Sequence, residues 1–253
     1  MSQLNGQVAL VTGAEVGIGR ATALALAKAG ADVAVHYYAD AAGADETVRA
    51  VAALGRRAAA FGADLTKIAE VKRVVAGAEE EFGRIDILVN NAGGLLGRHS
   101  VTEMSESFYR AVMDVNVLTM FLCCQAVASG MIARRSGAIV NLTSLAAHNG
   151  GGPGASMYSA AKAAVLALTK AYAKELAPHG IRVNAVSPGL IGGTPFHKTF
   201  TAPEVFAATV KTIPLGRAGT PEDVADVITF LAGPGASYLA GETIEINGGM
   251  FMR

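Results

Sequence analysis

The feature that most constrains the fold is a regular alternation of short apolar runs with stretches of helix-favouring composition. Apolar, β-branched runs predict seven strands, at residues 7–12, 31–37, 57–65, 85–93, 137–144, 181–189 and 242–248. Strands that are joined through helices run parallel, and the helices cover both faces of the sheet. The alternation therefore predicts an α/β fold, a doubly wound seven-stranded parallel sheet in three layers.

The segments between these runs predict the helices. We expect helices at about 20–30, 44–54, 68–82 and 221–233, two helical stretches within 104–133, and one around Tyr158. Residues 190–214 have no helical pattern and are expected to form an irregular substrate loop. Because no Pro/Ser-rich or charge-rich linker interrupts the alternation, we interpret residues 1–253 as one domain.

Charge and cysteine content exclude several function classes. Lys plus Arg and Asp plus Glu both number 21, so nothing favours a nucleic-acid or anionic-membrane partner. Cys123 and Cys124 are adjacent in an apolar run and predict core residues, and we expect no metal site. The N-terminus has no leader pattern, and we expect no apolar run of about 18 residues that could span a membrane. These features predict a cytoplasmic protein.

A glycine-rich turn follows the first expected strand. Gly13, Gly17 and Gly19 lie between the run QVALVT and a helical stretch. Glycine lets the backbone turn tightly and approach a diphosphate, which the free N–H groups of a helix N-terminus stabilise. The spacing predicts a dinucleotide site, although a plain turn that packs the helix on the strand is the alternative.

Tyr158 and Lys162 are four residues apart in an Ala-rich stretch, so they lie on one face of a helix. A neighbouring ammonium would lower the tyrosine pKa toward neutrality and make the phenol a general acid or base. Ser144 ends an expected strand, where parallel sheets bind ligands, and its hydroxyl could hold a carbonyl. The alternative is an ordinary surface pair.

These patterns together resemble the short-chain dehydrogenase/reductase family, over essentially the whole chain. The residues that carry the resemblance are TGAEVGIG (12–19), Asp64, NNAG (90–93), Asn116, Ser144, Tyr158 with Lys162, Asn184 with SPG (187–189), and GETIEINGG (241–249). The resemblance implies a Rossmann fold and an oxidoreductase that transfers a hydride between a nicotinamide and a carbonyl or secondary alcohol carbon.

The resemblance also implies residue roles. Tyr158 would exchange the proton, Lys162 would lower its pKa and bind the nicotinamide ribose, Ser144 would orient the substrate oxygen, and Asn116 would complete a water relay to Lys162. The other implied cofactor-binding residues are Gly13, Gly17, Ile18, Gly19, Tyr37, Asp64, Leu65, Asn90, Asn91, Ala92, Gly93, Pro188, Gly189, Ile191 and Thr194.

Several of these roles have structural alternatives. Asn116 could satisfy a backbone group, and Asp64 could cap the next helix. Two glycines between Ile191 and Thr194 could shift the register of Thr194. Ser144 precedes Tyr158 by fourteen residues, one more than is common in the family, so the intervening Gly-rich loop should bulge, with Thr143 as the fallback hydroxyl.

The cofactor signals are mixed. Tyr37 stands at the end of the second strand, where family members that use NAD often carry an acid. Glu15 and Val16 stand where members that use NADP usually supply a basic residue, and Glu15 would disfavour a phosphate if it pointed inward. We expect NADP, with NAD as the alternative.

The substrate pocket is expected from the loops 94–100, 145–157 and 190–206. Its apolar candidates are Leu95, Leu96, Met157, Leu190, Phe196 and Phe200, and its polar candidates, which could equally be surface residues, are His99, His148 and His197. The closest likeness within the family is to 3-oxoacyl thioester reductases. The alternatives are an NAD-dependent sugar, polyol or secondary-alcohol dehydrogenase, and a non-catalytic dinucleotide sensor.

Assembly and partners are implied by resemblance alone. Members of the family commonly pair subunits through the regions 221–231 and 242–246, and a homotetramer is expected. Arg134 and Arg135 could meet an acidic carrier protein, although a solvated helix end, which the helix dipole makes favourable, is the better explanation.

Overall fold

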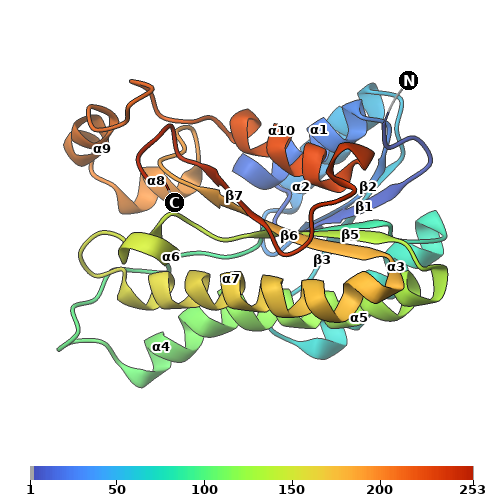
Figure 1. Cartoon of the computed structure of the whole chain (residues 1–253), viewed down its shortest axis with the longest axis horizontal. Coiled ribbons are helices and arrows are strands. Elements are labelled where there is room, and N and C mark those ends of the chain that lie inside the picture. Colours follow the sequence, from blue (N-terminus) through green and yellow to red (C-terminus); the bar gives the residue numbers. More distant parts are fainter. Residues whose placement is uncertain (1–2, 253) are drawn as a thin grey trace.

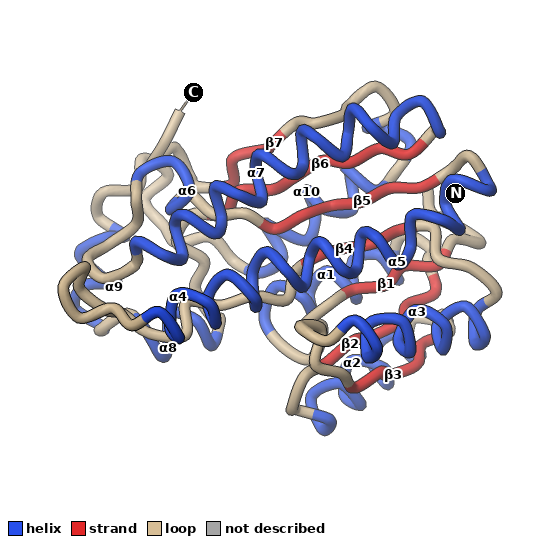
Figure 2. Tube along the Cα trace, turned by 90° about the horizontal axis from the view of Figure 1, so that it is seen from below, coloured by secondary structure: helices blue, strands red, loops and turns tan. Residues whose placement is uncertain are grey.

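The computed structural model describes residues 3–252, apart from the side chain of His197. Its strands form one sheet in the order β3-β2-β1-β4-β5-β6-β7, and every pair is parallel (Figures 1 and 2). The predicted seven-stranded doubly wound sheet is therefore confirmed. The strands are β1 (Val8–Val11), β2 (Asp32–Tyr37), β3 (Ala58–Gly62), β4 (Ile87–Asn90), β5 (Gly137–Leu142), β6 (Ile181–Pro188) and β7 (Thr243–Ile246).

Helices cover both faces, as predicted. In Figure 1, α1 (Gly17–Lys28), α2 (Ala41–Ala53) and α10 (Pro221–Ala232) lie above the sheet, and α3 (Ile68–Phe82), α5 (Thr119–Arg134) and α7 (Ser156–Leu176) lie below it. Side chains alternate along a strand, and β1 shows the result. Ala9 and Val11 join the core cluster of α1 and α10, whereas Val8 and Leu10 join that of α3 and α5.

The segment expected to hold two helical stretches is one continuous helix. It runs through α4 (Glu106–Met113), the π-helical turn η1 (Asp114–Leu118) and α5. Within residues 3–252, this is the one helix whose length and composition would let it cross a membrane, so the expectation that no such stretch exists is wrong. Here Val112, Cys123, Cys124 and Met131 are buried in the protein, and both cysteines are core residues as predicted.

Residues 190–214 are not irregular as expected. They contain α8 (Pro195–Phe200) and α9 (Pro203–Val210), which each begin with a proline whose fixed φ suits a first helical position. With the short helix α6 (Ala146–Asn149), they gather at the end of the molecule where β5 and β6 finish (Figure 1). Two short 3-10 turns, Ala177–His179 and Pro234–Ala236, complete the described elements.

Candidate active site

A cavity of about 700 Å³ opens at the carboxyl ends of the strands. The strand order reverses between β1 and β4, and such a switch point leaves a crevice in doubly wound sheets. Most of the sequence-predicted site residues line this cavity. They are Gly13, Gly17, Ile18, Asn91, Ala92, Gly93, Ser144, Tyr158, Lys162, Pro188, Gly189, Ile191 and Thr194.

The glycine turn forms one wall. Gly13 and Gly17 have φ of 62° and 58°, which side-chain-bearing residues rarely adopt. Gly19 is buried outside the cavity lining, and a Cβ there would collide with the Gly13 carbonyl oxygen. No side chain caps the N-terminus of α1, so its first N–H groups remain available to an anion. Asn91 fixes the turn by donating to the Thr12 and Gly13 oxygens at 2.9 and 2.8 Å.

His36 is a site residue that the sequence reasoning missed. It is 2% exposed, its Nδ1 accepts from the Gly13 N–H at 3.1 Å, and its Nε2 donates to the Ala63 oxygen at 3.1 Å. Burial lowers its pKa to about 4, so the ring is neutral at pH 7 and both bonds are satisfied. The available signal was a histidine in the second strand, whose other central residues are apolar.

The residue that lines the cavity at the end of β2 differs from the prediction by one position. Tyr37 is not among the cavity-lining residues, and a Cβ at Gly62 would lie 2.7 Å from its ring carbon Cζ, so the ring covers Gly62. Tyr38, which is 69% exposed, lines the cavity instead. Neighbouring residues of a strand point in opposite directions, so an error of one position exchanges the two tyrosines.

Asp64 and Leu65 also lie outside the cavity lining. Asp64 accepts from the backbone N–H and the hydroxyl of Thr66, at 3.0 and 2.6 Å, and pairs with Lys67 at 3.3 Å. Leu65 is 4% exposed in the core cluster of α3. Asp64 therefore stabilises the turn before α3, but no side chain among the described residues caps α3, so the alternative role of Asp64 as a helix cap is not confirmed.

Glu15 points into the cavity from the glycine turn. Burial raises the pKa of its carboxyl group, with a smaller contribution from the charge of Asp40, while backbone N–H groups of Glu15 and Tyr38 lower it. Its Oε2 atom is buried and has no hydrogen-bond partner among the described residues. The carboxylate therefore accepts from backbone N–H groups, and Oε2 is the oxygen that is left without a donor.

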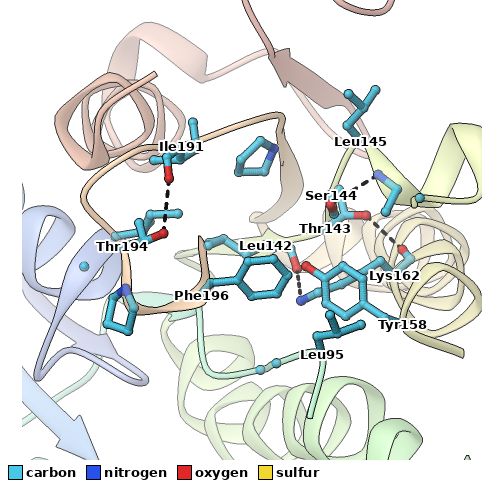
Figure 3. Close-up of a pocket in the computed structure, with 18 of the residues that line it drawn as sticks. Leu95, Leu142, Thr143, Ser144, Leu145, Tyr158, Lys162, Ile191, Thr194 and Phe196 are labelled. Carbon is cyan, nitrogen blue, oxygen red and sulfur yellow. Dashed lines mark hydrogen bonds between the residues drawn. The ribbon is translucent and has the colours of Figure 1, made fainter. Parts of the chain in front are cut away.

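Ser144 and Tyr158 both line the cavity, on the same side as Lys162 (Figure 3). Burial raises the pKa of Tyr158 to about 12, and a hydrogen bond from Ser144 to its hydroxyl acts in the opposite direction. Thr143, the fallback hydroxyl, donates to the Lys162 carbonyl at 2.8 Å and is 3% exposed. Ser144 is therefore the hydroxyl that accompanies Tyr158, and the tyrosine remains a neutral phenol at pH 7.

Lys162 does not act on Tyr158 as the sequence predicts. Its Nζ donates to the Leu142 carbonyl at 2.9 Å and lies 5.7 Å from the centre of the Tyr158 ring. Burial lowers its own pKa to about 8. Burial raises the pKa of Tyr158 in this geometry, so the lowered tyrosine pKa that the sequence predicts is not observed here.

Asn116 lies in the π-helical turn beside Gly93 and Lys162. Its Nδ2 donates to the Gly94 and Val112 carbonyls at 2.8 and 2.9 Å, and its Oδ1 accepts from the Gly94 N–H at 3.1 Å. A Cβ at Gly93 would lie 2.6 Å from Oδ1 and 3.2 Å from the Lys162 Nζ. Asn116 therefore satisfies backbone groups and also borders the ammonium, and π-turns are frequent at functional sites.

The bulge predicted between Ser144 and Tyr158 takes the form of α6 and a glycine loop. Gly150, Gly151 and Gly154 in this loop all have positive φ, between 70° and 81°. The sequence left the position of Thr194 open. In the structure Thr194 lies in the cavity wall, and its hydroxyl donates to the Ile191 carbonyl at 3.1 Å.

The substrate end of the cavity is mainly apolar. Leu95, Leu190 and Phe196 line it as predicted, whereas Leu96, Met157 and Phe200 do not. Further apolar lining residues that the sequence reasoning missed are Val115, Leu142, Leu145, Val205 and Met250.

The three histidines that were predicted as polar contacts are not among the cavity-lining residues that the structure describes. His99 packs against Phe108 at 4.2 Å between ring centres, and His148 pairs with Glu245 at 3.0 Å. His197 belongs to α8, and its side chain lies outside the described residues.

The two arginines considered for a carrier protein lie at the opposite end of the sheet from the cavity. Arg134 donates to the Ile85 carbonyl at 2.6 Å, just before β4 begins, and Arg135 donates to the Pro178 carbonyl at 3.0 Å. Among residues 3–252, no group of three or more His, Cys, Asp or Glu side chains could hold a metal ion.

Comparison with known proteins agrees with this geometry. The family model described as enoyl-(acyl carrier protein) reductase matches residues 13–251. The 3-oxoacyl-[acyl-carrier-protein] reductase of Synechocystis sp. is 44% identical over 253 residues, which is 100% of both chains.

Two solved structures are also similar. An NADH-dependent reductase responsible for alginate metabolism is 33% identical with a TM-score of 0.91, covering 100% of both chains. A 7α-hydroxysteroid dehydrogenase complexed with NADH and 7-oxo glycochenodeoxycholic acid is 34% identical with a TM-score of 0.93, covering 98% of this chain and 95% of that one. The chain belongs to the short-chain dehydrogenase/reductase family and is an NAD(P)-dependent oxidoreductase that acts on carbonyl and alcohol groups.

Proposed function

We propose that the chain reduces the ketone of a 3-oxoacyl thioester or a closely related β-oxo compound. The observation that carries this proposal is the Ser144 and Tyr158 pair beside an apolar wall that includes Leu95, Leu190 and Phe196. The full-length similarity to a 3-oxoacyl-[acyl-carrier-protein] reductase supports the same substrate class.

The residues present fit a nicotinamide dinucleotide. The uncapped N-terminus of α1 and the positive-φ glycines suit a diphosphate, and the Oε2 atom of Glu15 is a buried acceptor with no hydrogen-bond partner among the described residues. Asn91, Ala92 and Gly93 would face the adenosine side, and Pro188, Gly189, Ile191 and Thr194 the nicotinamide side. When bound, the dinucleotide supplies the hydride.

The chain itself supplies position and a proton. Ser144 donates a hydrogen bond that orients the substrate oxygen, and Tyr158, which is neutral at pH 7, donates its proton to that oxygen as negative charge develops there. The Lys162 ammonium stabilises the phenolate left behind. Apolar side chains around the phenol exclude water and strengthen these interactions.

The preferred cofactor in this proposal is NAD(H), not the NADP expected from the sequence. Glu15 lies in the cavity near Tyr38 and the charge of Asp40. A free ribose hydroxyl would donate to this carboxylate, whereas a 2′-phosphate would meet the like charges of Glu15 and Asp40. Both similar solved structures carry NADH in their descriptions.

Fluorescence titration of the purified protein with NADH and NADPH, at equal salt, tests the cofactor. Steady-state assays with acetoacetyl-CoA then test the substrate class. We expect tighter NADH binding and ketone reduction. Tighter NADPH binding would contradict the role given to Glu15, and cofactor binding without turnover of any ketone or alcohol would favour a non-catalytic sensor.

A second function is NAD-dependent oxidation of a polyol or secondary alcohol. Glu15 favours it, because a preference for NAD suits oxidation in cells that keep this cofactor mainly oxidised. The same assays, run with NAD and a panel of polyols, decide between the two. A higher kcat/KM for a polyol than for any 3-oxoacyl thioester would replace the first proposal with the second.

We also propose a cytoplasmic homotetramer that pairs through α10 and β7. Phe230 on α10 is 44% exposed, and Tyr238, which lies between α10 and β7, is fully exposed. Light scattering on a size-exclusion column should give four times the mass of 25.8 kDa. A Phe230→Asp variant should dissociate this interface, and an unchanged mass would place it elsewhere.

A further inference from the structure

Arg98 joins three segments that surround the substrate end of the cavity. It lies in the loop after β4, its Nη1 donates to the Pro153 carbonyl at 2.8 Å, and its Nε donates to the Phe200 carbonyl of α8 at 3.3 Å. The next residue, His99, donates its N–H to the Gly154 carbonyl at 3.1 Å. The guanidinium is thereby held in place at the rim, and it lines the cavity.

The charge of Arg98 is not balanced inside the cavity. Among the described lining residues, Glu15 in the glycine turn is the one with an acidic side chain. Besides Arg98, Lys162 beside Tyr158 is the lining residue with a Lys or Arg side chain. None of the ion pairs within residues 3–252 includes Arg98. A guanidinium has five N–H donors, and the two carbonyl contacts leave donors for a ligand.

A chain of contacts connects Tyr158 to Arg98, through Phe196 in the cavity wall and Phe200 behind it. The Tyr158 and Phe196 ring centres are 5.7 Å apart, and those of Phe196 and Phe200 are 5.5 Å apart. The carbonyl of Phe200 is in turn the acceptor for Arg98. A substrate with its ketone at Tyr158 and its carbon chain against Phe196 would extend toward the guanidinium.

We propose that Arg98 binds an anionic group of the substrate, a carboxylate or a phosphate, carried at the end remote from the ketone. This inference rests on the proposed function and narrows it. Arginine suits the role because its planar fork matches both kinds of anion. Its two carbonyl contacts hold the fork before the substrate arrives, which lowers the entropic cost of binding.

The test compares pairs of substrates in which one member carries an anionic group and the other carries none. Acetoacetyl-CoA carries phosphates, whereas the acetoacetyl thioester of N-acetylcysteamine carries none, and levulinate can be compared with its methyl ester. In Arg98→Met, we expect KM for the anionic member of a pair to rise about tenfold or more with little change in kcat, and KM for the neutral member to stay unchanged. The pair that responds distinguishes a phosphate from a carboxylate.

Two further variants separate recognition from structure. Arg98→Lys keeps the charge and should recover part of the loss, and Arg110→Met removes an exposed arginine paired with Glu106 and should change neither KM. Equal losses on charged and neutral substrates would show that Arg98 only fastens α8 to the loop, which overturns the inference. Turnover of no ketone by the wild type would overturn the proposed function as well.

Discussion

The Lys162 ammonium donates to the Leu142 carbonyl at 2.9 Å and lies over the Tyr158 ring, 5.7 Å from its centre. It therefore contacts the backbone at the end of β5. Burial leaves Tyr158 protonated, with a pKa of about 12, and gives Lys162 a pKa of about 8. The pair is arranged for proton donation, since the acid keeps its proton at pH 7 and a cation lies close to the phenolate that donation produces.

The pH dependence of ketone reduction follows from these two pKa values. Tyr158 stays protonated well above pH 8, so its titration does not limit the rate at neutral pH. Lys162 loses its charge as pH rises through about 8, and stabilisation of the phenolate is lost with it. We expect kcat/KM for reduction to be flat from pH 6 to about 7.5 and to fall above pH 8. A rate that rises continuously through that range would contradict this assignment.

Substitution of Tyr158 by Phe removes the proton donor and keeps the ring that packs against Phe196. General acid catalysis contributes a factor of about 10² to 10⁴. We expect kcat to fall by at least that factor, with cofactor affinity in the fluorescence titration changed less than about threefold. Full turnover in Tyr158→Phe would exclude the tyrosine as proton donor.

The sheet and the cavity wall could be predicted from sequence because they depend on local patterns. Strand periodicity placed all seven strands, and helical spacing put Tyr158 and Lys162 on one face. The end of β2 at Tyr37 was predicted correctly, but Tyr38, the residue after the strand, lines the cavity, and the path of the chain beyond a strand cannot be predicted from its alternation.

Other features depend on contacts between segments distant in sequence. The Lys162 to Leu142 bond spans 20 residues and the Arg98 to Phe200 bond spans 102. Nothing in the sequence near Arg98 shows that α8 will form beside it. Helices α8 and α9 were missed because they are short and have no strong amphipathic repeat, so only their first-position prolines were informative.

Gly93 is constrained by its neighbours and not by its backbone angles. In Gly93→Ala the new methyl would lie 2.6 Å from the Asn116 Oδ1 and 3.2 Å from the Lys162 Nζ, so one of these groups must move. We expect kcat/KM to fall at least tenfold, while the melting temperature decreases by only a few degrees. As a control, Gly55→Ala changes an exposed turn where no atom lies within 4 Å, and any strain from its φ of 75° should leave activity unchanged. Equal activity losses in both variants would contradict a role specific to Gly93.

His36 should make stability depend on pH. Its pKa is lowered from 6.5 to about 4 in the folded protein, so below pH 6.5 the unfolded chain binds more protons than the folded one. The free energy of unfolding should therefore fall as pH decreases from 6.5 to 4, by up to about 1.4 kcal/mol per pH unit from this residue. Urea denaturation at several pH values should show a shallower slope for His36→Asn than for the wild type, and His179→Asn, outside the core, should keep the wild-type slope. Identical slopes in all three proteins would rule out His36 as the titrating group.

Glu15 offers the sharpest test of cofactor choice, because one atom can be changed without altering shape. In Glu15→Gln the charge beside Tyr38 is lost while an amide oxygen can still accept a hydrogen bond from a ribose hydroxyl. We expect NADPH to bind about tenfold more tightly than it does to the wild type, and NADH affinity to change by less than about threefold. Glu46→Gln, which removes an exposed acid paired with Arg20 on the outer side of α2, is the matched control and should alter neither affinity. If Glu15→Gln weakened both cofactors equally, the carboxylate would serve the glycine turn itself, and the discrimination against a 2′-phosphate would have to come from Asp40.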